Sequence, residues 1–295
     1  MSSMIEIREL TKRYGRVAAV QDVTFDAAPG RVTGLLGLNG SGKTTTLRIL
    51  LGLSRASGGA ALINGKSYRD LKDPQGTIGA VLEQGLSHPG LTGRGHLMSQ
   101  ALLCGAGRAR VNTLLAYVGL AGAATTRTGD YSLGMRQRLA VATALLGEPA
   151  VLVLDEPANG LDPAGMAWLR ELLREHAQAG GTVLISSHLL SELEQLIDDV
   201  VIISQGRVRL QTSLTDLADS QVHRLRVRGG DPELLCQAFE RAGAEVSENG
   251  RSLLVAGLSP EDAGDIALRI QVPIYELVSE TPKLEEIFLN LAGSR

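Results

Sequence analysis

Directly after the mostly apolar run 32–36 stands Gly37-Leu38-Asn39-Gly40-Ser41-Gly42-Lys43-Thr44-Thr45, and the fold expected for the whole chain depends on it. This stretch matches the phosphate-binding pattern G-x-x-x-x-G-K-[ST] at every fixed position. Its three glycines let the backbone curl so that several N–H groups point at one anion. The sequence therefore predicts a loop that cradles phosphate groups.

The residues at the end of this loop indicate which phosphate ligand it binds. Lys43 would place a positive charge at the phosphates, and Thr44 would offer a hydroxyl to a magnesium ion. A helix beginning near Lys43 would add its free N–H groups and the positive end of its dipole. These features predict a nucleoside triphosphate with Mg²⁺. The alternative is a glycine-rich turn capped by Thr44, and the loop alone does not separate a kinase, a GTPase and a transport ATPase.

Composition limits the classes of function. The 295 residues, 44% of them hydrophobic, suit one large domain, or one of roughly 220 residues with a small appendage. A net charge of −3 without a basic tract gives no reason to expect a nucleic acid partner. The N-terminus lacks a signal-peptide pattern, and no apolar run is long enough to span a bilayer, which predicts a cytoplasmic chain. Cys104 and Cys236 are too far apart for a metal motif and are expected to be buried apolar residues.

Residues 1–217 show the alternation of strands and helices that is typical of an α/β domain. Alternating apolar residues predict an antiparallel hairpin with its turn at residues 12–16. Between residues 91 and 124 the strand signal disappears, so a helical subdomain is expected at about 91–148. Further strands are predicted at 60–63, 78–82, 150–154, 182–186, 200–204 and 207–210, and helices at 43–51, 163–178 and 189–197.

Residues 214–220 look like a linker to a second, smaller domain at 218–295. Its predicted order is β-α-β-β-α-β, with strands at 222–227, 245–248, 252–255 and 273–278, helices at 232–242 and 260–270, and a final helix at 282–291. That order suggests a ferredoxin-like α+β fold. No cluster of catalytic residue types is present, so an assembly or regulatory role is expected.

The apolar strand before Asp155-Glu156-Pro157 ends in two acids. Carboxylates at the carboxyl end of a parallel strand face the ligand crevice. Asp155 is suited to hold magnesium, and Glu156 to orient or deprotonate an attacking water. The alternative, that both acids merely cap the next helix, is disfavoured by the phosphate loop earlier in the chain.

A second anion site is indicated by Tyr131-Ser132-Leu133-Gly134-Met135-Arg136-Gln137-Arg138. Ser132 is a natural N-cap, and the N–H groups behind it are free to bind an anion. Here the sequence resembles the ATP-binding cassette (ABC) family, in which this signature helix of one subunit closes on the γ-phosphate held by the other. The commoner signature is Leu-Ser-Gly-Gly-Gln; Leu133 replaces its first glycine and Met135 its glutamine, while Ser132 and Gly134 remain.

The remaining ABC motifs occur in the family's order. Tyr14 resembles the aromatic residue that stacks on adenine, and Gln84 the glutamine that touches magnesium and senses the membrane partner. The segment 159–163 resembles the loop that crosses the dimer interface, with the alternative that Asp162 caps the helix begun by Pro163; both interpretations can hold together. His188 stands where the family places the histidine that contacts the γ-phosphate. His88, His96, His176 and His223 lack such a placement and are interpreted as surface or packing residues.

The resemblance covers residues 4 to about 215 and implies a P-loop NTPase of the ABC type, with a mixed sheet, an antiparallel β subdomain and an inserted helical subdomain. It implies catalysis by Glu156, His188, Lys43 and Gln84, and a magnesium site at Thr44, Gln84 and Asp155. The residues implied to bind ATP are Tyr14, Gly37, Asn39, Gly40, Ser41, Gly42, Lys43, Thr44, Thr45, Ser132, Gly134 and Asp162.

The implied function is that of an ATP-hydrolysing subunit of a transporter. Two copies would sandwich two Mg-ATP molecules and drive a separate membrane permease, docked at residues 84–97, on the cytoplasmic face of the membrane. The ending Pro282-Lys283-Leu284-Glu285-Glu286-Ile287-Phe288 and the signature look like the daunorubicin-resistance type of exporter ATPases, which implies export of drugs or other hydrophobic compounds. The alternatives are an importer subunit, a soluble ABC-type ATPase acting on ribosomes or DNA, and a regulatory ATP-binding module.

Overall fold

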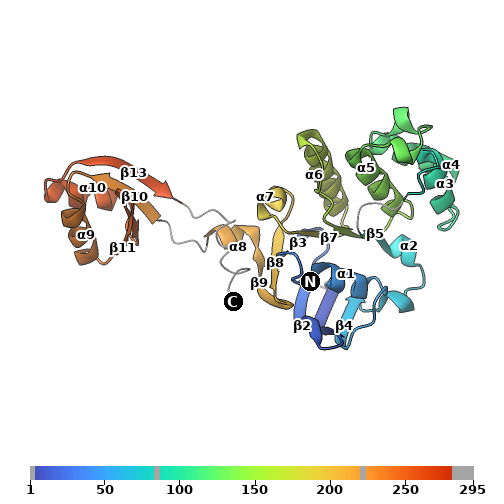
Figure 1. Ribbon diagram of the computed structural model, residues 1–295, viewed down its shortest axis with the longest axis horizontal. Coiled ribbons are helices and arrows are strands. Elements are labelled where there is room, and N and C mark those ends of the chain that lie inside the picture. Colours follow the sequence, from blue (N-terminus) through green and yellow to red (C-terminus); the bar gives the residue numbers. More distant parts are fainter. Residues whose placement is uncertain (1–3, 83–86, 220–223, 281–295) are drawn as a thin grey trace. The chain divides into compact units, whose positions relative to one another are not determined.

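The computed structural model describes residues 4–82, 87–219 and 224–280. The described residues divide into two compact units, the first ending at Leu214 and the second beginning at Thr215 (Figure 1). The first unit contains the phosphate loop and both acids of the expected site. Each unit has a hydrophobic core of its own.

A six-stranded mixed sheet forms the centre of the first unit. Its strand order is β5-β6-β7-β3-β8-β9, and only the last strand runs antiparallel to its neighbour. Every residue of β3, β6 and β7 is buried, which follows from apolar runs covered on both faces. The strands are β5 (Ile78–Val81), β6 (Val151–Asp155), β7 (Thr182–Ser187), β3 (Val32–Leu36), β8 (Asp199–Ser204) and β9 (Arg207–Ser213).

One face of this sheet packs on helix α1 (Lys43–Leu50) and on a three-stranded antiparallel sheet. That smaller sheet has the order β2-β1-β4, with β2 (Val17–Ala27), β1 (Ile5–Tyr14) and β4 (Gly58–Ile63). On the opposite face lie α6 (Pro163–Gln178) and α7 (Leu190–Leu193). There the sheet backbone closely approaches α7 and the segment after it, because a Cβ added at Gly34 would lie 2.8 Å from Ile197 and 3.5 Å from Leu193.

The helical subdomain expected between strands is present. In Figure 1 three helices cluster together: α3 (Gly93–Ala101), α4 (Arg108–Tyr117) and α5 (Leu133–Ala144). They stand between β5 and β6 in the chain, with the short turns η2 (Ala121–Ala123) and η3 (Thr128–Asp130) between α4 and α5. Two further short elements, η1 (Tyr68–Asp70) and α2 (Pro74–Thr77), connect β4 to β5 and were not predicted.

The second unit contains a four-stranded antiparallel sheet of order β11-β12-β10-β13. Helices α9 (Pro232–Arg241) and α10 (Pro260–Arg269) cover one face of it and bury Leu235 and Phe239 (Figure 1). The described elements follow the predicted order β-α-β-β-α-β, while the predicted final helix lies outside the described residues. The strands are β10 (Arg224–Gly229), β11 (Glu245–Asn249), β12 (Ser252–Ala256) and β13 (Ile274–Glu280).

Four local predictions were wrong. The expected turn at 12–16 is tighter, because Tyr14 pairs with Val17 and only two residues form the turn. The helix expected over 189–197 is assigned only at Leu190–Leu193. The expected linker 214–220 contains helix α8 (Leu214–Asp219), anchored by the buried side chain of Leu217. The two cysteines are half-buried rather than buried.

Candidate active site

Three strand ends of the mixed sheet meet at one edge. In the pairing register, Leu36 of β3 stands beside Ser187 of β7, and Asp155 of β6 stands beside Ser186. The residues that follow these strands therefore emerge together. This edge brings the phosphate loop, Glu156 and His188 to one place, as expected at the carboxyl ends of parallel strands.

The phosphate loop has the backbone that its glycines predict. Gly42 has φ 109°, a conformation that residues with a side chain rarely adopt, and a Cβ there would lie 2.7 Å from the carbonyl oxygen of Ala19. Gly37 is equally confined, since a Cβ would lie 2.4 Å from the carbonyl oxygen of Ile203. Helix α1 begins at Lys43 without a side-chain cap, so its first N–H groups are directed at the loop interior. This geometry fits an anion.

Lys43 projects into the same region and is nearly buried, with 6% of its side chain exposed. Its Nζ donates to the carbonyl oxygen of Gly37 at 2.6 Å and lies 3.3 Å from Oε1 of Glu156. The other carboxylate oxygen of Glu156 lies 2.8 Å from Nδ1 of His188. The loop lysine, the acid and the histidine thus form one contact chain.

The backbone of Glu156 is unusual for a residue with a side chain. Its φ is 50°, in the left-handed region that favours glycine. Its N–H donates to Oγ of Ser186 at 2.9 Å, which supports this conformation from the neighbouring strand. The strained turn directs the carboxylate away from the strand and toward Lys43 and His188.

Asp155 and Thr44 form the second polar pair of the site. Thr44 Oγ1 donates to Oδ2 of Asp155 at 2.8 Å, and Ser186 Oγ donates to Oδ1 of the same carboxylate. Hydroxyl and carboxylate oxygens are the ligands that Mg²⁺ prefers. Within the described part of the chain, no group of three His, Cys, Asp or Glu side chains could hold a metal by itself. The donor set therefore fits a magnesium ion that takes its other ligands from phosphate and water.

A cavity of about 420 Å³ lies between the phosphate loop, Glu156 and His188. The unpartnered hydroxyl of Ser41, buried at the loop, is an orphaned polar atom of the kind that phosphate oxygens satisfy. The residues lining the cavity are Ala19, Asn39, Gly40, Ser41, Gly42, Lys43, Thr44, Thr45, Glu156, Asn159 and His188. The sequence did not single out Ala19 or Asn159 as site residues. For Asn159 a signal existed, since it opens the segment 159–163 that resembles the loop at the dimer interface.

Two further residues were expected at this site, Tyr14 and Gln84. Tyr14 ends strand β1 and does not line the cavity; the residue is 53% exposed, and Lys12 Nζ lies 4.8 Å from the ring centre. An exposed ring of this kind can stack on a base. Gln84 lies outside the described residues.

The other expected ATP ligands, Gly37, Ser132, Gly134 and Asp162, do not line the cavity either. Ser132 caps α5, accepting a hydrogen bond from the Met135 N–H at 3.2 Å. Asp162 caps α6, accepting from the Gly165 N–H at 2.7 Å, so its interpretation as a helix cap is confirmed. In a single chain, the signature helix and the phosphate loop therefore do not share a cavity.

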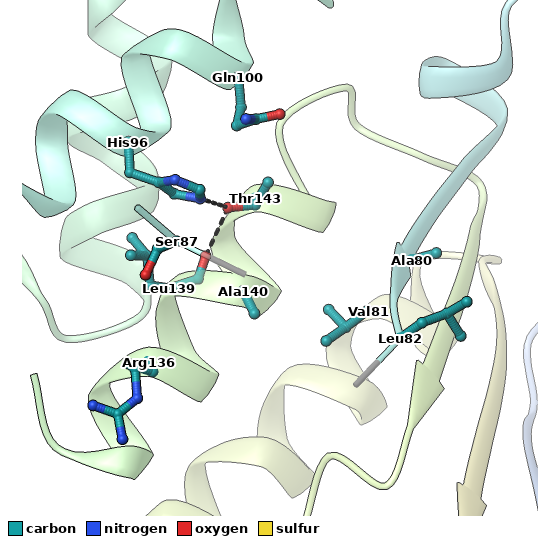
Figure 2. Close-up of a pocket in the computed structure, with 10 residues that line it drawn as sticks. All are labelled: Ala80, Val81, Leu82, Ser87, His96, Gln100, Arg136, Leu139, Ala140 and Thr143. Carbon is teal, nitrogen blue, oxygen red and sulfur yellow. Dashed lines mark hydrogen bonds between the residues drawn. The ribbon is translucent and has the colours of Figure 1, made fainter. Parts of the chain in front are cut away.

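A second cavity, of about 170 Å³, lies between the end of β5 and helices α3 and α5 (Figure 2). His96 lines it and is buried, and its Nε2 lies 3.2 Å from Oγ1 of Thr143. Burial lowers the pKa of His96 below its ordinary value. The lining residues are Ala80, Val81, Leu82, Ser87, His96, Gln100, Arg136, Leu139, Ala140 and Thr143. Two of them, Ser87 and His96, belong to the expected docking segment 84–97.

Among the helices that the structure describes, none is both long and apolar enough to cross a membrane.

Comparison with known proteins gives two family matches. Residues 20–159 match the family described as "ABC transporter". Residues 223–285 match a family described only as a domain of unknown function. The two matches fall on the first and the second unit respectively.

Similar proteins cover nearly the whole chain. The bacitracin transport ATP-binding protein BcrA of Bacillus licheniformis is 33% identical over 99% of this chain and 98% of its own. The Nod factor export ATP-binding protein I of Burkholderia orbicola (strain AU 1054) is 32% identical over 98% and 97%. Among solved structures, the dimeric bacterial ABC transporter cassette MJ0796 matches with a TM-score of 0.65 and 25% identity, over 72% of this chain and 99% of that one.

Proposed function

Because this chain belongs to the ABC transporter family as an ATP-binding subunit and ATPase related to export proteins, we propose that two copies enclose two Mg-ATP molecules at a shared interface. Each nucleotide would be held by Lys43 and Thr44 of one copy and by Ser132 and Gly134 of the other. The observation that carries this proposal is the Lys43–Glu156–His188 contact chain on the wall of a cavity that Ser132 does not reach. The similarity to a dimeric cassette supports it.

We assign each side chain a role in hydrolysis. Glu156 orients the attacking water and accepts its proton, and His188 contacts the γ-phosphate while holding the Glu156 carboxylate in place. Lys43 places its positive charge at the phosphates. When bound, Mg²⁺ neutralises the charge that develops on the phosphate oxygens. It would be held by Thr44 and Asp155, with Gln84 as the third protein ligand.

The adenine would stack on Tyr14. That ring lies outside the cavity, at the exposed end of β1, where a flat aromatic surface is available to a base. Asn159 is added to the expected set, because it lines the cavity together with Glu156 and His188. Asp162 would approach the second copy while capping α6.

The transported compound is proposed to be a drug or another hydrophobic molecule that the cell exports. Support comes from relatives named for bacitracin transport and Nod factor export, and from the signature and ending that resemble the daunorubicin-resistance type. Import remains the alternative direction. A regulatory module that binds ATP with little turnover is the alternative outside transport.

A separately encoded membrane permease would be driven by closure and reopening of the two copies, on the cytoplasmic face of the membrane. We propose that it docks at residues 84–97, where the cavity of Figure 2 opens between β5, α3 and α5. The cavity stands at the junction of the mixed sheet and the helical subdomain. A segment of the permease bound there would therefore contact both the mixed sheet and the helical subdomain.

The second unit is proposed to be a ferredoxin-like domain at residues 218–295 that assembles or regulates the transporter. Its sheet order and its two helices on one face agree with that fold. Within its described residues, no group of three His, Cys, Asp or Glu side chains could bind a metal, so a binding role suits it better than metal catalysis.

Two measurements test the proposed function. The purified chain should hydrolyse ATP in the presence of Mg²⁺, and a chain that binds ATP without turnover would favour the regulatory alternative. Co-purification with the membrane protein encoded beside it would support the transporter. That neighbour should contain about six apolar segments of roughly 20 residues.

A further inference from the structure

Two loops of the first unit interlock through leucine and glycine. Leu133 is the first residue of α5, and a Cβ added at Gly160 would lie 2.0 Å from its Cδ2 atom. In the other direction, a Cβ added at Gly134 would lie 3.7 Å from Cδ2 of Leu161. Each loop thus offers a leucine to the glycine of the other, and we call these four residues the crossed pair.

The two contacts of the crossed pair, Gly134 with Leu161 and Gly160 with Leu133, differ in how much space they leave for an added side chain. At Gly134 an added methyl group would make an ordinary van der Waals contact, whereas at Gly160 it would overlap Leu133. Gly160 also has φ 74°, which favours glycine for a separate reason. Leu133 in turn is the residue that replaces the first glycine of the commoner signature. The Leu133 side chain therefore fills the space that a side chain at position 160 would need.

The loop that contains Gly160 is continuous with the candidate active site. The Asn159 N–H donates to the carbonyl oxygen of Glu156 at 3.2 Å, and the Leu161 N–H donates to that of Ala158 at 3.1 Å. Asn159 itself lines the cavity together with Glu156. The position of Gly160 is therefore tied by one short turn to the residue proposed to activate water.

We propose that Leu133 is a positioning residue for ATP hydrolysis, which sets the loop 159–162 by packing against Gly160. This inference rests on the proposed function, because it assumes that Glu156 and Asn159 act on the nucleotide. Leu133 touches no reacting atom in this account. It links the turn that carries Ser132 to the turn that carries Glu156, so the two parts keep a fixed spacing within one chain.

The contact between Leu133 and Gly160 can be tested with a substitution at Gly160 and a compensating one at Leu133. In Gly160→Ala the new Cβ overlaps Cδ2 of Leu133, but it lies 3.9 Å from the Leu133 Cβ, which is contact distance. In the double variant Gly160→Ala with Leu133→Ala, the two methyl groups therefore meet without overlap. Gly180→Ala is the matched control, because Gly180 has φ 91° and nothing lies within 4 Å of an added Cβ. It measures the cost of a side chain at positive φ alone.

The experiment measures kcat and KM for ATP, together with thermal unfolding, for the full chain and these four variants. Gly160→Ala should lower kcat by about tenfold to a hundredfold with KM nearly unchanged, since displacements near 1 Å can cost that much. Leu133→Ala should lower kcat less, and the double variant should recover most of the loss of Gly160→Ala. Gly180→Ala should keep the parent's turnover.

Three outcomes would overturn the inference. The double variant could be as slow as Gly160→Ala, the losses of the two single variants could simply add, or Gly160→Ala could match the parent. A variant that fails to fold is identified by its thermal unfolding, and the comparison then rests on Leu133→Ala, whose kcat must still fall. A parent chain without ATP turnover contradicts the proposed function itself and overturns the positioning role with it. If the parent is active but the double variant does not recover the activity lost in Gly160→Ala, only the positioning role is contradicted and the proposed function stands.

Discussion

Lys43 Nζ lies 3.3 Å from Oε1 of Glu156, although the two residues stand 113 positions apart in the chain. Both side chains are largely shielded from solvent, with 6% and 21% exposed. The contact exists because β3 and β6, on either side of β7, end at the same edge of the mixed sheet. It places the cation proposed to bind phosphate directly beside the carboxylate proposed to activate water.

Replacing Glu156 by glutamine is expected to separate binding from hydrolysis. The amide keeps the size of the side chain but cannot accept the proton of the attacking water. ATP turnover should fall by about a hundredfold or more, as for loss of a general base, while ATP binding stays nearly intact and the closed dimer accumulates. Steady-state ATPase assays and ATP titration measure the two effects. Turnover equal to that of the parent would remove Glu156 from its role.

Lys43→Ala is expected to weaken ATP binding. The substitution removes the one lysine that lines the cavity among the described residues, so the phosphates lose their nearest cation. Affinity should drop by about tenfold or more, as expected for a charge-assisted hydrogen bond worth roughly 1.5–3 kcal/mol. Lys72→Ala, at an exposed position away from the cavity, is the control. If both variants bind ATP as the parent does, the phosphate-cradle assignment is wrong.

The sequence predicted the components of this site better than their contacts. The phosphate loop, Asp155, Glu156 and His188 could be placed because each follows an apolar run that reads as a parallel strand. The positive φ of Glu156 and the lining role of Asn159 depend on how the turn after β6 is supported by Ser186, which no local pattern shows.

Contacts between distant segments explain the other differences. The hairpin turn is tighter than predicted because pairing continues to Tyr14 and Val17, so the tyrosine ends a strand instead of lying in a loop. The segment expected to be a linker forms helix α8, and the side chain of Leu217 in this helix is buried. The crossed pair joins the start of α5 to the turn around Gly160, and such a contact between distant segments is set by packing rather than by a local sequence pattern.

Ser132→Ala is expected to impair turnover without weakening ATP binding to a single chain. The substitution removes the hydroxyl that caps α5, which costs about 1 kcal/mol of stability, and it removes the proposed contact to the partner's γ-phosphate. Ser259→Ala is the control, because Ser259 likewise caps a helix, α10, by accepting from the Asp262 N–H at 3.0 Å; its Oγ also donates to Oδ2 of Asp262 at 2.7 Å. Both variants should unfold at lower temperature, and only Ser132→Ala should lose turnover. Equal turnover in the two would refute a role for Ser132 beyond capping.

The stability of the chain should depend on pH through His96. Burial lowers its pKa in the folded state, so the unfolded chain takes up a proton first as the pH falls below about 6.5. The contribution of His96 to the free energy of unfolding is therefore intact above that pH and is lost as the pH falls further. His96→Gln should make the decline between pH 7 and 5 shallower, as measured by denaturant unfolding. The exposed His88, changed to glutamine, is the control; an identical decline in all three proteins would contradict the assignment.

The central claim is that each nucleotide is held by two copies of the chain, and mixing two defective variants tests it. Both variants carry Glu156→Gln to prevent turnover; one also carries Lys43→Ala, and the other Ser132→Arg. In a mixed dimer, one site combines an intact phosphate loop with an intact signature, whereas each variant alone has two defective sites. Capture of one tagged variant by the other, with and without Mg-ATP, should show mixed dimers only with Mg-ATP. Mixed dimers no more abundant than dimers of either variant alone would contradict the shared site.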